Sequence, residues 1–403
     1  MSTPHPAMLP RRAPGTGFTL VEMMVAMAVG LVLALVVSLA MLSMGTQFRS
    51  VSANSSAQIN SQLALSLIDD LGRSAGAGLY NNGQPLCQAF NAWYGGAVKS
   101  NGAPLLAARI IDGGANTASD RIVFTSSMAT GPLSGMPVMV AMASAAAPIA
   151  VSDAGLIDQN DIALVGVPGS TVPCTLFQVS AAPTVGTACD GNATQCKTLQ
   201  HGAGGSYNPV AGTFTTEPRY GFSTSGGVTG PAVVMRLGSG FRQDAFAVLC
   251  GTLVRYNAFT DAPGCSTGPL AFNGGANALV SDVVLMRAQY GISSGASSDI
   301  VTNWVAASGG TWGTPAATDA GRIKAIRVLL VTRSAVPANE NVTAATCTNG
   351  GGVVNVGPCS FDDAEAPVID LSAVPVPTGR NWRQYRYRVH QAVIPLRNVI
   401  WGS

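Results

Sequence analysis

The chain has 403 residues, of which 10% are charged, and its formal net charge is +2. So small a net charge supplies no wide basic field, and nucleic acid is therefore not an expected partner. The low charge and the 47 glycines favour a turn-rich extracytoplasmic β-protein over a cytosolic enzyme.

The first predicted element is an apolar segment, residues 18–44, in which Glu22 is the only charge. As a helix this segment would be about 40 Å long at roughly 1.5 Å per residue, which exceeds the roughly 30 Å hydrocarbon core of a bilayer. Arg11 and Arg12 precede the segment, and basic residues favour the cytoplasmic side. We therefore expect a single membrane span with a cytoplasmic N-terminus and the body outside the cytoplasm.

Small residues precede this apolar segment, whereas an ordinary secretory signal places them after a shorter apolar core. The motif Gly17-Phe18-Thr19-Leu20-Val21-Glu22 resembles the type IV prepilin (class III) signal. That resemblance implies that a prepilin peptidase cuts between Gly17 and Phe18, that Phe18 becomes an N-methylated N-terminus, and that the apolar helix stays on the mature protein.

Glu22 has two compatible interpretations. Thr19 and Glu22 have the spacing of a capping box, and Phe18 and Met23 have that of a hydrophobic staple. An isolated carboxylate inside a membrane span also costs about 2.5 to 3.5 kcal/mol. In a filament its charge would be compensated by the amine of a neighbouring Phe18. Thr19 and Glu22 are therefore the candidate assembly residues.

The helix is predicted to continue beyond the membrane, because no proline occurs between Pro14 and Pro85. Its second half has an apolar stripe with a spacing of four residues, which predicts a face packed on the following domain. The stripe comprises Ile59, Leu63, Leu67 and Leu71. Glycines then mark the end of the helix, at Gly72, Gly76 and Gly78.

The remaining sequence predicts strands separated by turns, and the expected fold class is α+β: a long N-terminal helix packed on an antiparallel β-rich globular domain. The expected organisation is a leader at 1–17, a membrane-spanning half of the helix at 18–44, an amphipathic half at 45–79 and one body at 80–403. Long loops are expected near 201–230 and 293–317. Candidate strands are Arg121–Thr125, Pro137–Ala143, Asp161–Val167, Ala232–Leu237, Ala247–Tyr256, Ser281–Tyr290, Arg322–Thr332 and Tyr385–Ile394.

All eight cysteines follow the membrane segment, and an even number in an oxidising periplasm favours disulfides. Proximity in the sequence suggests three pairs and leaves a fourth, although many other connectivities are open. The suggested pairs are Cys189 with Cys196, Cys250 with Cys265, Cys347 with Cys359, and Cys87 with Cys174. No metal site or cofactor is expected, because the chain has no CxxC motif and only three histidines, His5, His201 and His390.

Two further patterns have competing interpretations. Residues 291–295 match the nucleophile-elbow pattern GxSxG around Ser293, and Asp370 and His390 follow in the order of an α/β-hydrolase, but the alternation of strands and helices is missing. The interpretation as a loop is preferred, and no catalytic residue is assigned.

The closing segment mixes aromatic and basic residues, a combination found in single-strand nucleic-acid sites, yet it alternates as a half-buried strand does. Tyr385, Tyr387 and Val389 would lie on one face, and Arg386, Arg388 and His390 on the other.

Four segments together resemble the PilW family of minor type IV pilins: residues 64–76, 281–291, 323–334 and 396–398. The resemblance implies a minor pilin that is stored in the inner membrane with its body in the periplasm. From there it would join a complex that primes the pilus, at the tip of the filament on the cell surface, with roles in twitching motility and cell adhesion. The implied partners are other minor pilins, the major pilin, the prepilin peptidase, the inner-membrane assembly platform and, less directly, a tip adhesin.

Two alternatives remain open. A pseudopilin of a type II secretion system would share the signal, the helix and Glu22. A membrane-anchored secreted hydrolase that uses Ser293 is the less favoured alternative. Loss of pili on deletion would indicate the minor pilin, whereas loss of exoprotein secretion with intact pili would indicate the pseudopilin.

Overall fold

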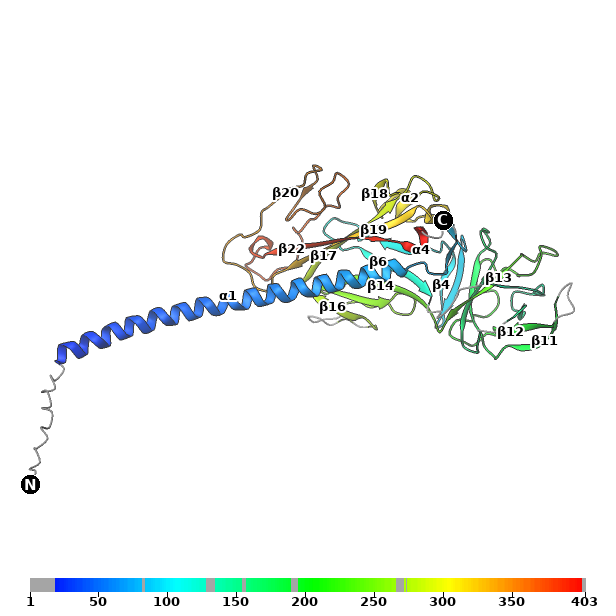
Figure 1. Ribbon diagram of the computed structural model, residues 1–403, viewed down its shortest axis with the longest axis horizontal. Coiled ribbons are helices and arrows are strands. Elements are labelled where there is room, and N and C mark those ends of the chain that lie inside the picture. The colour runs from blue at the N-terminus through cyan, green and yellow to red at the C-terminus, as the bar shows by residue number, and fades with distance from the viewer. Residues whose placement is uncertain are drawn as a thin grey trace, which may run out of the picture. The chain divides into compact units, whose positions relative to one another are not determined.

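The computed structural model describes residues 19–81, 84–127, 135–153, 157–189, 195–265, 272 and 274–400. The chain divides into two compact units, Met1–Ser55 and Ser56–Ser403. The N-terminal helix contributes residues to both units, and all strands belong to the second (Figure 1).

Helix α1 (Leu20–Ser74) is 55 residues long. Leucine, methionine and alanine dominate its first half, and these residues have high helix propensity. Its part in the second unit buries one face, which carries Ala64, Leu65 and Ile68. The predicted stripe was therefore only partly right, because Leu63 is 68% exposed, whereas Leu67 and Leu71 pack against the core but are partly buried. The helix ends close to where the glycines predict, and Gly76 and Gly78 adopt the positive φ that favours this residue type.

A five-stranded antiparallel sheet lies beside this part of α1. Its order is β16-β15-β14-β6-β5. The strands are β5 (Ala108–Ile111), β6 (Arg121–Ser127), β14 (Phe241–Leu249), β15 (Thr252–Asn257) and β16 (Asn277–Ser281).

A four-stranded antiparallel sheet is built from the C-terminal part of the chain, in the order β18-β17-β19-β22. Short helices accompany it, and a two-stranded ribbon stands in the long connection between β19 and β22. The strands are β17 (Val283–Ile292), β18 (Asn303–Ala306), β19 (Ile323–Arg333) and β22 (Tyr387–Pro395), and the ribbon is β20 (Cys347–Thr348) with β21 (Val354–Asn355). The helices are α2 (Gly310–Gly313), α3 (Ala317–Ala320), the 3-10 turn η1 (Trp382–Gln384) and α4 (Arg397–Ile400).

The middle of the chain forms a six-stranded sheet, β4-β3-β10-β9-β13-β7, and a three-stranded sheet, β11-β12-β8. Strand β10 is parallel to β3 and antiparallel to β9. The strands of the six-stranded sheet are β3 (Phe90–Tyr94), β4 (Ala97–Ala103), β7 (Met136–Pro137), β9 (Ile162–Gly166), β10 (Cys174–Gln178) and β13 (Val233–Gly238). The others are β8 (Ile149–Val151), β11 (Thr184–Ala188), β12 (Gln195–Leu199) and the ribbon of β1 (Tyr80–Asn81) with β2 (Gln84–Pro85).

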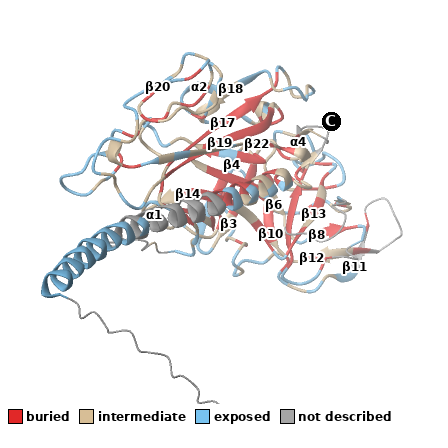
Figure 2. Cartoon of the chain, turned by 60° about the vertical axis from the view of Figure 1, so that its left-hand side comes forward, coloured by how far each residue is buried: buried red, intermediate tan, exposed pale blue. Residues whose placement is uncertain are grey.

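The largest apolar core joins α1 to the five- and four-stranded sheets. It contains Ile68 of the helix, Phe124 of β6, Met286 of β17, Ile326 of β19 and Ile394 of β22. Figure 2 shows the buried residues concentrated on the strands of the body. The part of α1 within the second unit is therefore a core element of that unit.

The predicted fold class is confirmed, and so are six of the predicted strands in outline, as β6, β9, β13, β17, β19 and β22. The prediction of one strand over Ala247–Tyr256 was wrong, because Cys250 and Gly251 both have positive φ and form a two-residue turn between β14 and β15. Ser281 ends β16, and positive φ at Asp282 separates it from β17.

Two other boundaries also differ from expectation. Most of Pro137–Ala143 is irregular, because β7 stops at Pro137. The expected loop at 293–317 contains β18 and α2. The stretch 201–230 has no strand or helix in the structure, as expected for a long loop.

Four disulfides join the eight cysteines: Cys87–Cys174, Cys189–Cys196, Cys250–Cys265 and Cys347–Cys359. These are the pairs that proximity in the sequence suggested. The first one links positions 87 residues apart and ties the start of the body to β10. The other three close local loops.

Candidate assembly site

The N-terminus of α1 is closed by a reciprocal pair of hydrogen bonds. The Glu22 amide donates to Thr19 Oγ1, and the Thr19 amide donates to Glu22 Oε2, both at 3.2 Å. The Thr19 hydroxyl also lies 3.2 Å from Glu22 Oε2. The capping box expected from the sequence is therefore present, and both residues are exposed.

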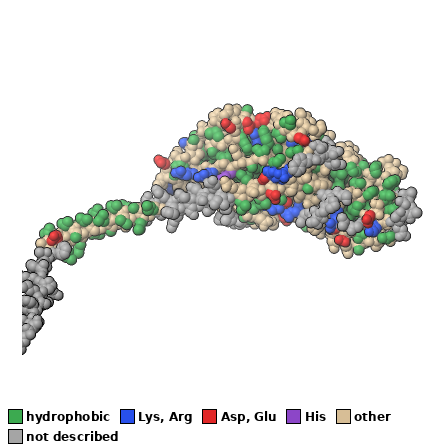
Figure 3. Space-filling model, viewed as in Figure 1, with side chains coloured by type: hydrophobic (Ala, Val, Ile, Leu, Met, Phe, Trp, Pro, Cys, Tyr) green, Lys and Arg blue, Asp and Glu red, His purple; other side chains and the backbone are tan. Residues whose placement is uncertain are grey.

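The apolar segment that follows has no covering within its own unit. Leu20–Met41 is long and apolar enough to cross a membrane, with a mean hydropathy of 2.7, and none of it is buried. Figure 3 shows this surface as a nearly continuous band of hydrophobic side chains. Each Å² of such surface left in water costs about 25 cal/mol, so the segment needs a membrane or other helices around it.

The expected processing site lies outside the described residues. Gly17 and Phe18 precede Thr19, and the staple contact of Phe18 with Met23 falls there as well. Cleavage and N-methylation therefore remain predictions from the sequence motif.

The other end of α1 is held by a residue near the C-terminus. The Asn398 side-chain amide donates to the carbonyls of Arg73, at 3.3 Å, and Ala75, at 3.0 Å. Arg73 is in the last turn of α1 and Ala75 directly follows the helix, a place where helices leave acceptors unsatisfied. Gly72 allows close packing there, since a Cβ at this position would clash with Ile394 Cγ2. The segment 396–398 thus closes the core around α1.

Arg327 of β19 is the largest fully buried side chain in the described part of the body. Its Nη1 donates to Asp363 Oδ2 at 2.6 Å, and its Nε donates to Gln289 Oε1 at 2.7 Å. The guanidinium lies between the rings of Trp304 and Phe361, 4.9 and 4.8 Å from their centroids. A buried cation is tolerated when it is fully paired in this way.

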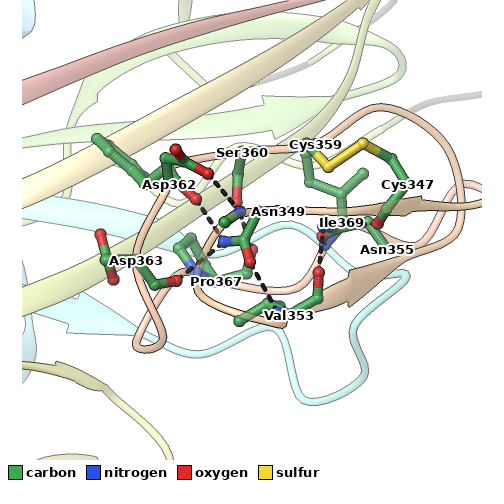
Figure 4. The surroundings of a disulfide bond; sticks show 12 residues. Cys347, Asn349, Val353, Asn355, Cys359, Ser360, Asp362, Asp363, Pro367 and Ile369 are labelled. Atoms are coloured by element: carbon green, nitrogen blue, oxygen red, sulfur yellow. Dashed lines mark hydrogen bonds between the residues drawn. A yellow bond between two sulfur atoms is a disulfide. The ribbon is translucent and has the colours of Figure 1, made fainter.

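The loop that Arg327 holds is the disulfide-closed connection between β19 and β22. Figure 4 shows Cys347–Cys359 at one side of the loop and Asn349 inside it. The Asn349 amide donates to the carbonyls of Phe361, at 2.6 Å, and Asp363, at 2.9 Å. The loop is therefore fixed internally as well as through Arg327.

Asp120 joins the five-stranded sheet to β17. Its carboxylate accepts hydrogen bonds from the amides of Ala288, at 2.8 Å, and Gly113, at 3.1 Å, and from Arg287 Nη1 at 3.1 Å. Burial raises the pKa of Asp120 to about 6, although Arg287 and the two amides oppose that shift. This cluster is a structural join between two sheets.

The GxSxG motif does not form a nucleophile elbow. Ser293 is fully buried, its hydroxyl donates to the Gly295 carbonyl at 2.7 Å, and it lies 3.3 Å from the Arg322 carbonyl. His390 lies beside the Thr332 hydroxyl, and Asp370 accepts the amide of Ser372. Ser293 therefore has carbonyl partners in place of the general base that a serine nucleophile needs.

Both described histidines are partly buried, and burial lowers the pKa of each. His201 Nε2 lies 2.8 Å from the Ala147 carbonyl, and its ring packs edge-on against Phe177 in an apolar cavity of about 120 Å³. For His390 the charge of Arg388 adds to the effect of burial on the pKa. His5 lies outside the described residues.

Strand β22 alternates as predicted. Tyr387 and Val389 pack with the apolar cluster on one face, whereas Ala392 and Ile394 belong to the core around α1 on the other. Arg386 and Arg388 are exposed. One face of β22 therefore packs on the small apolar cluster, and the other packs on the core around α1.

The sequence argument did not single out Arg327 or Asn398 as individual residues. Lys324 and Arg327 were nevertheless visible as two charges inside the apolar run of β19, which indicates buried partners. Lys324 Nζ donates to the carbonyl of Ala296 at 2.8 Å. Asn398 carried no comparable signal, because a lone asparagine in a tail has many possible roles.

Comparison with known families agrees with this geometry. Residues 16–38 match the prokaryotic N-terminal methylation motif, so the chain is a pilin-type protein with a prepilin signal on its N-terminal helix. Residues 271–398 match PilW, the type IV pilus-assembly protein W. The chain thus carries a PilW domain and is a type IV pilus-related pilin. No curated protein and no solved structure matches it at a significant level.

These matches cover the two regions described above. The motif includes the capping box and most of the exposed apolar segment, and the PilW region includes Arg327, the disulfide-closed loop and Asn398. The motif implies processing by a prepilin peptidase, and the family implies pilus components as partners.

Proposed function

We propose that the protein is a minor pilin that helps to prime assembly of the type IV pilus, in a complex with other minor pilins at the tip of the filament. It would be inserted in the inner membrane with its body in the periplasm, processed between Gly17 and Phe18, and transferred to the pilus. The observation that carries the proposal is the exposed apolar segment Leu20–Met41 with an acidic capping box at its start.

Transfer from lipid to a helical bundle explains why this surface is uncovered. In lipid the apolar side chains are solvated by acyl chains, and in a filament they would contact the equivalent helices of neighbours. Glu22 would then lose its access to water and need a cationic partner, for which the methylated amine of a neighbouring Phe18 is available.

The first test separates capping from charge pairing. Glu22→Gln keeps a side chain that accepts a hydrogen bond from the Thr19 amide but removes the charge, and Glu22→Asp keeps the charge on a shorter side chain. In a deletion strain we expect both variants to be processed, Glu22→Gln to leave piliation at the level of the deletion, and Glu22→Asp to restore it at least in part. Full piliation with Glu22→Gln would refute the pairing.

The second test concerns cleavage of the leader and the proteins that are isolated together with the processed chain. Mass spectrometry of the protein isolated from membranes should find an N-methylated chain that begins at Phe18 in the parent and an uncut chain in Gly17→Val, with Gly15→Ala as the matched control. Co-isolated proteins should include other minor pilins. An unmethylated parent chain that begins at Met1 would contradict the proposal.

A pseudopilin of a type II secretion system is the second candidate, because the N-terminal helix alone does not distinguish it. The match of residues 271–398 to a pilus-assembly family favours the pilin. Deletion should remove surface pili and twitching motility while exoprotein secretion continues. The opposite pair of phenotypes would assign the protein to secretion. Antibody labelling of intact pili would test the tip position.

A further inference from the structure

A groove of about 300 Å³ opens on the second unit between the five-stranded sheet and the segment that follows β4. It lies on the sheet face opposite to α1. In the register of β6 with β14, Ile122 faces Phe246 and both belong to the core around the helix, whereas the next pair, Val123 and Ala245, belongs to a separate cluster. Arg121, two residues before Val123, shares that second face.

The groove has an unbalanced charge. Its lining includes three cationic side chains, Lys99, Arg109 and Arg121, and one carboxylate, Asp261. None of these four groups forms an ion pair within the described part of the chain, whereas Arg236, Arg255, Arg287 and several others do. In a protein with 22 lysines and arginines in 403 residues, a groove whose lining carries three cations against one carboxylate attracts an anion.

Arg121 is held in position by a buried tyrosine. Its Nη1 donates to the hydroxyl of Tyr256 at 3.0 Å, and Tyr256 is only 4% exposed. Arg121 Nε has no acceptor among the described residues but is itself buried, so a ligand in the groove would be bound by the Nη groups. Arg121 lies opposite Ile111 and Arg109 lies opposite Val123, so the two arginines are diagonal neighbours on one face of adjacent strands.

The rest of the wall suits a small sugar ring better than a bare ion. Ser100, Thr125 and Gln243 supply polar groups, and Phe90, Leu105 and Tyr256 supply apolar surface. A volume of about 300 Å³ is at the lower end of the range for small-ligand sites, and a lone phosphate would leave most of it to water. Guanidinium groups bind carboxylates through paired hydrogen bonds of matching geometry.

We propose that this groove binds the carboxylate of an acidic sugar of the uronate class, with Arg121 as the primary anion contact and Arg109 and Lys99 as supporting cations. The ligand would be a single uronate unit, free or at an exposed position of a polysaccharide. Binding needs neither cleavage of the leader nor filament formation, so its test is independent of the proposed role in assembly.

The test uses the full chain in detergent micelles, titrated by calorimetry with glucuronate and galacturonate. Glucose serves as the neutral control, and inorganic phosphate and sulfate serve as ion controls. We expect saturable uronate binding that weakens as salt is added, with no heat from glucose. The affinity should fall about tenfold or more in Arg121→Gln, because a charge-assisted hydrogen bond is lost, and by a smaller factor in Arg109→Gln.

Two further variants keep the test interpretable. Arg380→Gln removes an exposed arginine elsewhere on the body and should leave the affinity unchanged. Tyr256→Phe keeps the buried ring but releases Arg121, and it should weaken binding without a large change in the melting temperature. No uronate binding, equal binding of glucose, equal binding of phosphate as an adventitious ion only, or unchanged affinity in a folded Arg121→Gln would each overturn the proposal.

Discussion

The two units of this protein treat their apolar residues in opposite ways. Leu20–Met41 leaves its leucine, valine and methionine side chains at the surface, whereas the second unit buries residues such as Ile68 and Ile326 completely and even encloses Arg327. The body is therefore stabilised by its own contacts. The first unit depends on a membrane or on other chains. Substitutions should accordingly change folding in one unit and association in the other.

The sharpest form of this comparison uses one helix. Ile68→Ala removes a fully buried side chain of α1, and Leu33→Ala removes one that is 59% exposed. We expect Ile68→Ala to lower the free energy of unfolding of the body by about 4 kcal/mol. Leu33→Ala should leave it unchanged and lower membrane retention or assembly instead. Denaturant titration of the full chain in micelles measures the free energy of unfolding of both variants. A comparable loss in the two would contradict the distinction between the units.

The second prediction concerns the buried cation of the body. Arg327→Gln removes the ion pair with Asp363 and the stacking between Trp304 and Phe361. Because Asp363 is partly exposed and can recover hydration, we expect a loss of about 3 kcal/mol, at the lower end for a broken buried pair. Arg380→Gln is the matched exposed control. A stability equal to that of the parent would mean that the loop holds without Arg327.

A smaller effect is expected at the C-terminal end of α1. Asn398→Ala removes two hydrogen bonds to the carbonyls of Arg73 and Ala75. The expected cost is about 1 to 2 kcal/mol, since each net hydrogen bond contributes roughly 1 kcal/mol. Hydrogen exchange of the last turn of α1 should accelerate more than exchange in β10. Uniform acceleration across the body would show that Asn398 acts globally.

The smallest effect is a pH dependence confined to the body. Burial lowers the pKa of His201 below the ordinary 6.5. The unfolded chain then binds more protons than the folded chain as the pH falls from 6.5 through the lower folded pKa, so stability is lost in that window. His201→Gln retains a donor for the Ala147 carbonyl. Its melting temperature should fall less than that of the parent between pH 7.5 and 5.5. An equal fall would exclude His201 as a cause.

The sequence predicted well where one local pattern dominates. The helix, its capping box and strands such as β19 follow from composition, spacing and long apolar runs. The turn at Cys250 and Gly251 was hidden inside an apolar run, because nothing local separates a buried strand from two strands joined by a two-residue turn. In the two middle sheets only β9 and β13 were predicted as full strands, because the other strands are short and show little alternation of apolar and polar residues.

The candidate functional residues show the same difference between local patterns and long-range contacts. Thr19 and Glu22 were recognisable because both lie in one local motif. Arg121 and Tyr256, 135 positions apart, meet only through the pairing of β14 with both β6 and β15. Asn398 reaches Arg73 across 325 positions. Such contacts depend on strand order, and a single sequence does not specify strand order.

The contact between Asn398 and the end of α1 also bears on the order in which the body folds. Strand β22 and Asn398 complete the core around the part of α1 in the second unit, although Asn398 lies 323 and 325 positions from its two partners. Closure over so long a separation is slow, so the core around α1 stays open until this late contact forms. A chain truncated before β22 should therefore keep its apolar N-terminal segment but have an open body, which limited proteolysis should degrade faster than the body of the parent.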